Sequence, residues 1–392
     1  MREVVIVSAV RTPIGSFNGA LKGIPATKLG SLVVAEAVKR AGLEPGQVDE
    51  VIMGNVVSAG LGQAPARQAA LGAGLPDSVG ALTINKVCGS GLMAVVLAAR
   101  AIALRDADVV VAGGMESMSR APYLLAHARE GYRMGHATVL DAMIHDGLWD
   151  PYHDFHMGMG GELCAAGYQI GREAQDDYAI QSYQRALKAQ REGKFQAEIV
   201  PVEVAVKKGE IGLFEEDEDP KRFDLGKLKR LPPTFKPDGT ITPGNAPSVN
   251  DGAAALTVMS LERAEALDLQ PMARIVGSAT AALAPEWFTI APAEAIRKVL
   301  KKTGLDLNDI ALFEINEAFA VVALAAIQRL GLDRERVNIH GGAVALGHPI
   351  GASGARILTT LLYAMQDQGA KRGLAAICLG GGEAVAMVVE QP

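Results

Sequence analysis

Residues 88–102 read CGSGLMAVVLAARAI, a glycine-rich turn that runs into an apolar, helix-like segment. The stretch GASGARILTTLLYAM, from Gly351, has the same design 263 residues later. Similar strand-like segments flank both: VDEVIMGN, ending at Asn55, resembles LNDIALFEIN, ending at Asn316, and DVVVAGGME resembles LAAICLGGGE. The three offsets, 261, 263 and 267 residues, are nearly constant. Because ordered agreement of three features is rare by chance, we predict a duplicated α/β half.

Apolar runs alternate with helix-like segments in both halves. Strands are expected at 4–10, 48–57, 108–112 and 374–378, and helices at 29–41 and 91–104. Continuous β-branched runs are typical of strands buried on both faces, so the pattern favours parallel sheets covered by helices. From about Ser119 to Asn250 the chain is richer in His, aromatic and charged residues, which indicates a long insertion with a helix near 174–193.

Composition restricts the class of protein. The 392 residues contain 38 Lys plus Arg and 44 Asp plus Glu, a net charge of −6, and 49% are hydrophobic. These values argue against disorder and against nucleic-acid binding. Three cysteines exclude a disulfide scaffold and suit a reducing compartment, so we expect a cytoplasmic protein. The longest stretch without charge, Val337 to Ala355, contains five Gly, two His and one Pro, and no membrane span is expected.

The insertion carries a locally basic segment, although the whole chain is acidic. Its members are Lys207, Lys208, Lys221, Arg222, Lys227, Lys229, Arg230 and Lys236. A solvated face and a patch for a phosphorylated ligand explain such a cluster equally well. Both interpretations stay open at this point.

Two of the three cysteines occupy corresponding ends of the two halves. Cys88 lies at a helix start, where N–H groups and a partial positive charge stabilise a thiolate, so we expect its pKa to be lowered. Taken alone, a free cysteine is more often a small buried hydrophobe; we interpret Cys164 in this way. Cys378 ends a strand and enters Gly380-Gly381-Gly382, whose N–H groups suit an oxyanion site. Under the duplication, Cys88 and Cys378 are expected to meet.

His348 and Asn316 take matching places in the second half. His348 precedes the second helix-like segment, at the counterpart of the Cys88 turn, and Asn316 ends a strand. A lone histidine is usually structural, but the symmetry of this arrangement favours a catalytic role.

Other motifs fail. Residues 89–94 fit the loose pattern G-x-G-x-x-G/A, yet the acidic residues Asp106 and Asp108 do not follow the second strand, where a dinucleotide site needs them. The cysteines lack zinc-like spacing, so no metal site is expected.

Seven stretches resemble the thiolase family, nearest to its short-chain, biosynthetic subgroup of acetyl-CoA acetyltransferases. They are SAVRTPIGSFNG, GNVVSAGLGQAPARQAAL, NKVCGSGL, GGMESMSRAPY, NEAFA, NIHGGAVALGHPIGASGARI and CLGGG, and they span nearly the whole chain. The resemblance implies an α/β fold of two duplicated halves, each with a mixed five-stranded sheet between helices, plus an inserted loop domain. The implied boundaries are 1–118, completed by about 245–270, for the first half, 119–244 for the CoA-binding insertion, and 271–392 for the second half.

The resemblance also implies an activity and residue roles. Two acetyl-CoA would condense reversibly to acetoacetyl-CoA and CoA, without a cofactor, in a homotetramer. Cys88 matches the acylated nucleophile, His348 the group that takes its proton, and Cys378 the acid/base at the α-carbon. Asn316 matches the holder of a catalytic water, and the N–H groups of Cys88 and Gly380 match the second oxyanion site. The implied CoA and acyl contacts are Leu148, His156, Met157, Arg222, Phe235, Pro243, Ser248, Ala318 and Phe319.

The sequence departs from the family pattern at three places and leaves alternatives open. The departures are Gly160-Gly161 with Leu163, Pro247 where a CoA-contacting Ser usually lies, and Glu383-Ala384. A broader-range 3-ketoacyl-CoA thiolase remains an alternative, although His156-Met157-Gly158 and Phe319 predict a pocket closed by bulky side chains and a preference for short acyl chains. A ketosynthase-like enzyme is disfavoured by Cys378, a silent acyl-CoA-binding relative by the complete catalytic set, and a dehydrogenase by the misplaced acid.

Overall fold

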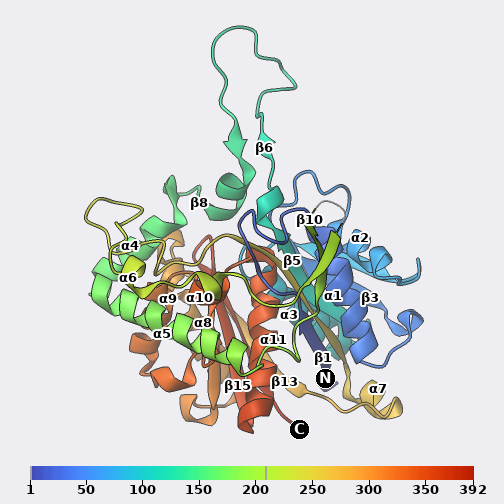
Figure 1. Ribbon diagram of the computed structural model, residues 1–392. Helices are drawn as coiled ribbons and strands as arrows, with labels where there is room; N and C mark the ends of the chain where they lie inside the picture. Colours follow the sequence, from blue (N-terminus) through green and yellow to red (C-terminus); the bar gives the residue numbers. More distant parts are fainter. Residues whose placement is uncertain (1, 208–209) are drawn as a thin grey trace.

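The first half of the chain builds a five-stranded unit. The structure is a computed structural model that describes residues 2–207 and 210–392 (Figure 1). In it, β1 (Val4–Arg11), β12 (Asn250–Ser260), β5 (Val109–Ser117), β3 (Glu50–Gly54) and β4 (Gly80–Ile84) lie side by side in that order, and the short β2 (Gly15–Ser16) extends β12. β3 is parallel to β4 and β5, whereas β12 is antiparallel to β5 and β1.

The second half repeats this order, which confirms the predicted duplication. Its strands are β13 (Ala273–Ala282), β16 (Glu383–Glu390), β15 (Arg372–Leu379) and β14 (Leu312–Ile315). A single parallel bridge from Phe313 to Val337 stands where β4 pairs with β3, so this half has four strands and one bridge where five strands were expected. β1 pairs with β13, and the two halves therefore share one continuous sheet.

The expectation of parallel sheets is correct only for the strands toward the two ends of the sheet, and the inner strands are antiparallel. β3, β4 and β5 are parallel, as are β14 and β15, because a helix carries the chain back between them. β16 follows β15 through the tight turn at residues 380–382 and must be antiparallel to it. β12 arrives only after the long insertion, so no crossover helix fixes its direction.

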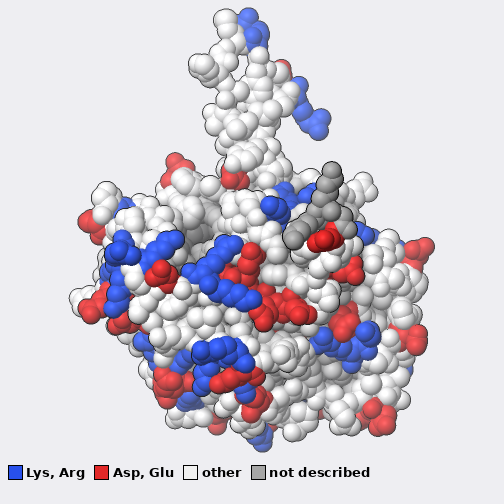
Figure 2. Space-filling view, in the orientation of Figure 1, with Lys and Arg blue, Asp and Glu red and all other residues white. Residues whose placement is uncertain are grey.

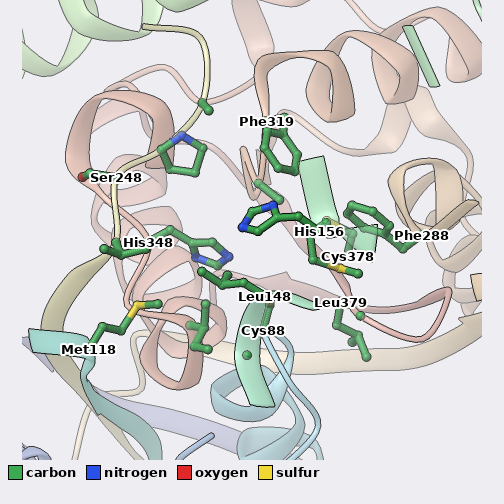
Figure 3. A pocket seen from close by; sticks show the side chains of 18 of the residues that line it. Cys88, Met118, Leu148, His156, Ser248, Phe288, Phe319, His348, Cys378 and Leu379 are labelled. Carbon is green, nitrogen blue, oxygen red and sulfur yellow. The ribbon is translucent and has the colours of Figure 1, made fainter. Parts of the chain in front are cut away.

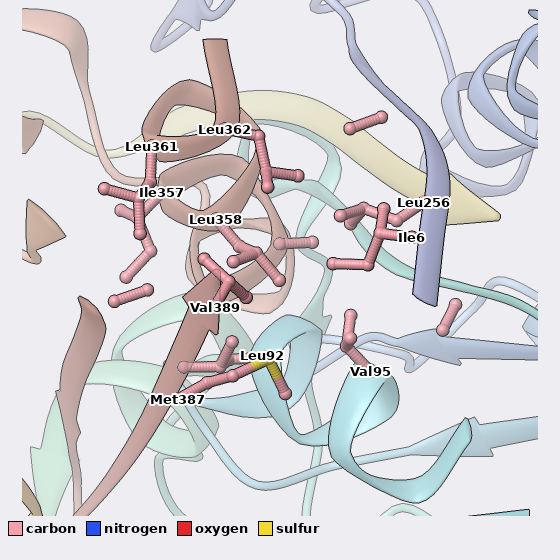
Figure 4. Close-up of a cluster of buried hydrophobic side chains, with 14 of the residues drawn as sticks. Ile6, Leu92, Val95, Leu256, Ile357, Leu358, Leu361, Leu362, Met387 and Val389 are labelled. Carbon is pink, nitrogen blue, oxygen red and sulfur yellow. The ribbon is translucent and has the colours of Figure 1, made fainter. Parts of the chain in front are cut away.

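Helices form a central layer and two outer layers. α3 (Ser90–Leu104) and α11 (Ile350–Gln368) pack against each other between the halves, as Leu92 and Leu358 show in Figure 4. The outer helices are α1 (Ala26–Arg40) and α2 (Pro65–Gly72) on the first half, and α8 (Ala291–Thr303) with α9 (Ala320–Leu330) on the second. α3 and α11 come so close that their backbones are almost in contact, because a glycine lies between them. A Cβ on Gly91 in α3 would lie 2.7 Å from Ala355 N in α11.

One helical stretch, Val87–Leu104, is long and apolar enough by composition to cross a membrane. Half of it is buried, and α3 lies between the two halves of the sheet. Its apolar composition therefore fits a core helix.

The insertion between β5 and β12 carries short elements and two longer helices. They are η2 (Met118–Arg120), β6 (Tyr123–Leu124), β7 (Leu140–Asp141), η3 (Met143–Leu148), β8 (Trp149–Asp150), β9 (Phe155–His156), α4 (Met157–Gly167), α5 (Arg172–Arg191), β10 (Val202–Lys207), β11 (Glu210–Phe214), η4 (Asp219–Arg222) and α6 (Leu225–Leu228). β6 and β7 form the base of an arm that projects from the body, and α4 and α5 pack on α9 (Figure 1).

The remaining elements are short connectors. They are η1 (Pro45–Gln47), α7 (Leu261–Ala266), η5 (Pro285–Ile290), η6 (Leu307–Asp309), η7 (Arg334–Arg336) and α10 (Ala343–Leu346).

Most predicted elements agree with the structure within a few residues, but two strands differ. The strand expected at 48–57 is shorter, and the one expected to end at 112 continues to Ser117. β5 runs through Gly113 and Gly114 because β12 and α11 approach it closely there. A Cβ on Gly114 would lie 2.0 Å from Gly351 O.

Candidate active site

A cavity of about 150 Å³ opens where α3 and α11 begin. Most of the predicted site residues line it: Cys88, Leu148, His156, Met157, Phe235, Ser248, Ala318, Phe319, His348, Cys378 and Gly380. Figure 3 shows His348, His156, Phe288 and the sulfur of Cys378 around the same space. The expected meeting of Cys88 and Cys378 at the junction of the halves is therefore confirmed.

A strained turn places Cys88. Val87 has φ +44°, an unfavourable conformation for a β-branched residue. The Ser90 hydroxyl accepts a hydrogen bond from Lys86 N at 2.8 Å and donates one to Val87 O at 2.7 Å, and so holds both sides of the turn. Lys86 also pairs with Glu383 at 2.5 Å, which connects this turn to the start of β16. Glu383, which departs from the family pattern, thus has a partner across the two halves.

The expected lowering of the Cys88 pKa is wrong. Burial raises the pKa of this thiol to about 12, and the nearby carboxylate of Glu116 adds to the rise. The backbone N–H groups of Cys88 and Gly380 face the sulfur and act in the opposite direction. Loss of hydration in an apolar cavity therefore outweighs the helix N-terminus, and Cys88 rests as a thiol.

Cys378 is buried at the end of β15. Burial raises the pKa of its thiol well above the ordinary value, and a charge on Cys88 raises it further. The following turn has φ +81° at both Gly381 and Gly382, which only glycine adopts without strain. This turn brings Gly380 N to the Cys88 sulfur.

His348 is held in one orientation from both sides. Its backbone N donates to Asn250 Oδ1 at 2.8 Å, and its Nδ1 lies 2.6 Å from Ser353 Oγ. Because the Ser353 hydroxyl donates to Pro349 O at 2.9 Å, its oxygen accepts from His348 Nδ1–H. His348 Nε2 is then the unprotonated nitrogen, and it has no hydrogen-bond partner among the described residues.

The ring of His348 is neutral. Burial, and then the charge of Arg356, lower its pKa to about 3. A neutral imidazole with a free Nε2 can accept a proton from a thiol.

Asn316 follows β14 and is buried. Neither side-chain atom has a hydrogen-bond partner within the described part of the chain. Asn316 does not line the cavity itself, but Ala318 and Phe319 do. An amide with two free polar atoms in this position suits a bound water.

Aromatic rings close one side of the cavity. His156 stacks on Phe235 with ring centroids 4.8 Å apart, and Phe235 meets Phe319 edge-on at 6.2 Å. Phe288, which the sequence did not indicate, adds a further ring. A Cβ on Gly160 would lie 2.6 Å from Phe288 Cε1, so the departure at Gly160 makes room for this ring.

Arg222 and Pro243 do not line the sulfur cavity. They line a second cavity of about 350 Å³ together with Tyr183, Phe223, Asp224, Lys227, Leu228, Leu231 and Gly244. The segment 243–248 connects the two, since Pro243 and Gly244 border one cavity and Ala246 to Ser248 border the other.

Ion pairs partly neutralise the basic segment. Arg222 pairs with Glu218 at 3.2 Å and with Asp219 at 3.6 Å, and Lys221 pairs with Glu216. Figure 2 shows Lys and Arg side chains beside acidic ones on the face that carries α6. Lys208 and the side chain of Lys207 lie outside the described residues.

Ser248 borders the sulfur cavity, but its hydroxyl is already engaged. It donates to the carboxylate of Asp219 and lies 2.9 Å from Asn250 Oδ1. Pro247, next to it, lines the cavity without an N–H or a hydroxyl.

Several residues of the site carried no readable sequence signal. Met118, Phe288 and Ile350 line the cavity as ordinary apolar residues. Ser353, which the sequence analysis did not single out, lies in the first turn of α11 and contacts His348, which precedes that helix. In the part of the chain that the structure describes, no group of three or more His, Cys, Asp or Glu side chains is arranged to hold a metal ion.

Comparisons with known proteins cover the whole chain. The thiolase N-terminal domain family matches residues 4–262, and the thiolase C-terminal domain family matches residues 269–391. The chain is 55% identical to acetyl-CoA acetyltransferase 1 of Arabidopsis thaliana over 99% of this chain and 94% of that protein. It is 52% identical to an acetyl-CoA acetyltransferase of Pseudomonas aeruginosa over 99% of both chains. The crystal structure of the Bacillus anthracis acetyl-CoA acetyltransferase superposes with a TM-score of 0.97, at 45% identity, over 100% of this chain and 99% of that one.

Proposed function

This chain belongs to the thiolase family and is an acyltransferase, and we propose that it catalyses the reversible Claisen condensation of two acetyl-CoA to acetoacetyl-CoA and CoA. The observation that carries the proposal is the single cavity that holds two cysteines, a histidine and paired backbone N–H groups. An acyl enzyme needs one nucleophile, and removal of an α-proton needs a second, separate base. Cys88 and Cys378 supply both.

In the first half-reaction, His348 Nε2 takes the proton of the Cys88 thiol. The thiolate attacks the carbonyl carbon of acetyl-CoA, and the C–S bond to CoA breaks. His348 returns the proton to the departing CoA thiolate. The N–H groups of Cys88 and Gly380 stabilise the negative oxygen of the tetrahedral intermediate, since both face the Cys88 sulfur.

In the second half-reaction, the Cys378 thiolate removes a proton from the methyl group of a second acetyl-CoA. The enolate carbon attacks the acetyl group on Cys88, the Cys88 C–S bond breaks to give acetoacetyl-CoA, and the proton held by Cys378 passes to the departing Cys88 thiolate. A charge on Cys88 would raise the pKa of Cys378. The acylated sulfur of Cys88 is neutral, so it does not oppose ionisation of Cys378. A water held by Asn316 stabilises the enolate oxygen, and His348 joins it only when its Nε2 carries a proton.

CoA lies along the segment 243–248, with its thioester in the sulfur cavity and its nucleotide end in the second cavity. Tyr183 and Phe223 stack there at 4.8 Å, and Arg222 and Lys227 supply positive charge for phosphate groups. The insertion, residues 119–244, thus contributes most CoA contacts, and the halves at 1–118 with 245–270 and at 271–392 contribute the catalytic groups. No separate cofactor takes part, since acyl transfer between thiols needs none.

The acyl range is narrow. A small cavity bordered by Phe235, Phe288 and Phe319 supports acetyl and acetoacetyl groups over long chains. A broader-range 3-ketoacyl-CoA thiolase is the second candidate, because an acyl chain of any length shares the same chemistry at sulfur.

We propose a homotetramer in the cytoplasm. The outer edge of β4 ends the sheet and exposes Leu82, which suits pairing with a second copy. The projecting arm exposes large apolar side chains, with Tyr123 at 68% and Met134 at 85%, which suits a contact between dimers (Figure 1). Sedimentation of the intact chain against a variant with 125–138 replaced by a short Gly-Ser linker tests this, with tetramer expected only for the intact chain.

The test of the activity is incubation with acetoacetyl-CoA and CoA, following the loss of 3-ketoester absorbance. We expect rapid thiolysis by the intact protein and none by Cys88→Ala. No turnover by the intact protein would favour the silent acyl-CoA-binding relative.

A further inference from the structure

Glu116 is a buried carboxylate that the proposed mechanism does not use. It lies at the carboxyl end of β5 and is fully buried. Its Oε1 accepts hydrogen bonds from Asn55 Nδ2 at 2.9 Å and Val57 N at 3.2 Å. Its Oε2 accepts from Val56 N at 3.0 Å and from Gly351 N at 3.0 Å. The carboxylate thus connects the end of β3 to the first turn of α11, in the other half of the protein.

The contact with Gly351 replaces a missing helix cap. α11 has no side-chain cap of its own, and its first N–H groups need acceptors. A carboxylate close to these groups also interacts favourably with the helix dipole. Because His348 and Pro349 immediately precede α11, the position of this first turn sets the position of the His348 ring.

The same junction holds the Cys88 turn. A Cβ on Gly54 would lie 2.5 Å from Ser90 Cβ and 2.9 Å from Gly351 O, so the starts of α3 and α11 both press on the end of β3. A Cβ on Gly351 would lie 2.6 Å from Glu116 Oε2. Cys88, the nucleophile, and His348, its base, come from different halves of the protein. Glu116 forms its hydrogen bonds where these two halves meet.

We propose that Glu116 is a positioning residue for the acyl transfer proposed above: its carboxylate fixes the start of α11, and with it His348, against the half that carries Cys88. Its charge has a second effect, since it lies close enough to Cys88 to raise the pKa of that thiol. Glu116 thereby favours the neutral thiol of Cys88 in the resting protein.

The ionisation of Glu116 gives the proposal a pH signature. Burial raises the pKa of this carboxyl to about 7, against the lowering effect of the N–H donors. The titratable groups that face it are Asp251, on the neighbouring β12, and Cys88, while β3 and α11 present only amide donors. Protonation of Glu116 below this pKa leaves the four donors around it with one acceptor fewer. We therefore expect kcat to fall as the pH drops through about 7.

Three variants test the proposal. Glu116→Gln keeps the size of the side chain, but its amide NH2 group would face the N–H donors that the carboxylate now accepts from. Glu116→Asp keeps the negative charge, but its shorter side chain does not reach Gly351 N. Asp251→Asn is the matched control, since it removes a neighbouring carboxylate that does not touch α11. Each is measured for kcat, for KM and for the pH dependence of Cys88 alkylation by iodoacetamide.

We expect Glu116→Gln to lower kcat by about 10- to 100-fold with little change in KM, as for a misplaced catalytic group. Its alkylation profile should move to lower pH, because the charge that raises the pKa of Cys88 is gone. Glu116→Asp should lose kcat without this movement. Asp251→Asn should keep kcat and move the acidic fall of kcat to lower pH, since Asp251 raises the pKa of Glu116.

Wild-type kcat in Glu116→Gln, or a loss of kcat with an unmoved alkylation profile, would overturn the proposal. If Glu116→Gln does not fold, wild-type kcat in Glu116→Asp would overturn it. Alkylation needs no substrate, so failure of the thiolase activity itself would appear separately, as absent turnover in the unmodified protein.

Discussion

Ser353 Oγ lies 2.6 Å from His348 Nδ1 while its own hydroxyl donates to Pro349 O. This relationship decides which nitrogen of His348 faces Cys88 without a proton. A neutral histidine in the other tautomer would present N–H to the thiol and could not accept its proton.

Ser353→Ala should therefore lower kcat. Without an acceptor at Nδ1 the ring can adopt both tautomers and both orientations, and we expect a loss of about tenfold, below the full ~10²–10⁴-fold worth of a positioned base. Steady-state thiolysis of acetoacetyl-CoA measures it. Thr359→Val is the matched control, because Thr359 is buried on the same helix and its hydroxyl has no hydrogen-bond partner among the described residues. Equal losses in both variants would contradict the tautomer argument.

Substitutions of Cys88 and Cys378 should block different steps of the reaction. Cys88→Ala should form no acid-stable acyl enzyme with radiolabelled acetyl-CoA. Cys378→Ala should still be labelled on Cys88, yet fail to exchange the acetyl methyl protons with deuterated solvent, since the base is missing. Stable labelling of Cys378 in the unmodified protein would reverse the assigned roles.

Alkylation of Cys88 should show no acidic plateau. A preformed thiolate would react at a constant rate at low pH, but here burial raises the pKa of Cys88 to about 12 and lowers that of His348 to about 3. The rate with iodoacetamide should rise about tenfold per pH unit between about pH 6 and pH 9. A pH-independent rate over this range would indicate a resting ion pair.

Phe288→Leu should widen the acyl range. The ring of Phe288 occupies space that Gly160 leaves free at the cavity wall, and its removal admits a few more methylenes. We expect kcat/KM for a 3-ketohexanoyl-CoA to improve about tenfold relative to acetoacetyl-CoA, within the ~1–3 kcal/mol that a methylene is worth in a pocket. Phe195→Leu, at a buried ring outside the cavity, should leave the ratio unchanged. An unchanged ratio in Phe288→Leu would show that this ring does not limit the length of the acyl chain.

Pro247→Ser should lower KM for CoA more than it changes kcat. Pro247 lines the cavity without a donor, and the neighbouring Ser248 hydroxyl already donates to Asp219. A new hydroxyl would add ground-state binding, which appears in KM. A large change in kcat at constant KM would separate this loop from CoA.

The motifs and their order predicted the site well where local sequence records the chemistry. Cys88, His348 and Cys378 each sit beside glycines that a turn requires, and the repeat placed them at matching ends of the sheet. Asn316 was expected near the site because it ends a strand of the second half. The sequence could not tell that Arg222 and Pro243 border a separate cavity, because the segments that carry them meet only in the folded insertion.

The sequence alone determined the duplication, the approximate positions of several strands and the pairing of the two cysteine motifs, because periodicity and glycine placement act over a few residues. Only the tertiary structure decided the pKa of Cys88, since burial depends on what the other half places over the sulfur. It likewise brought Phe288 to Gly160 and Glu116 to Gly351, a bond across 235 residues of chain. These contacts follow from packing one half on the other, and no local pattern specifies which residues will face each other there.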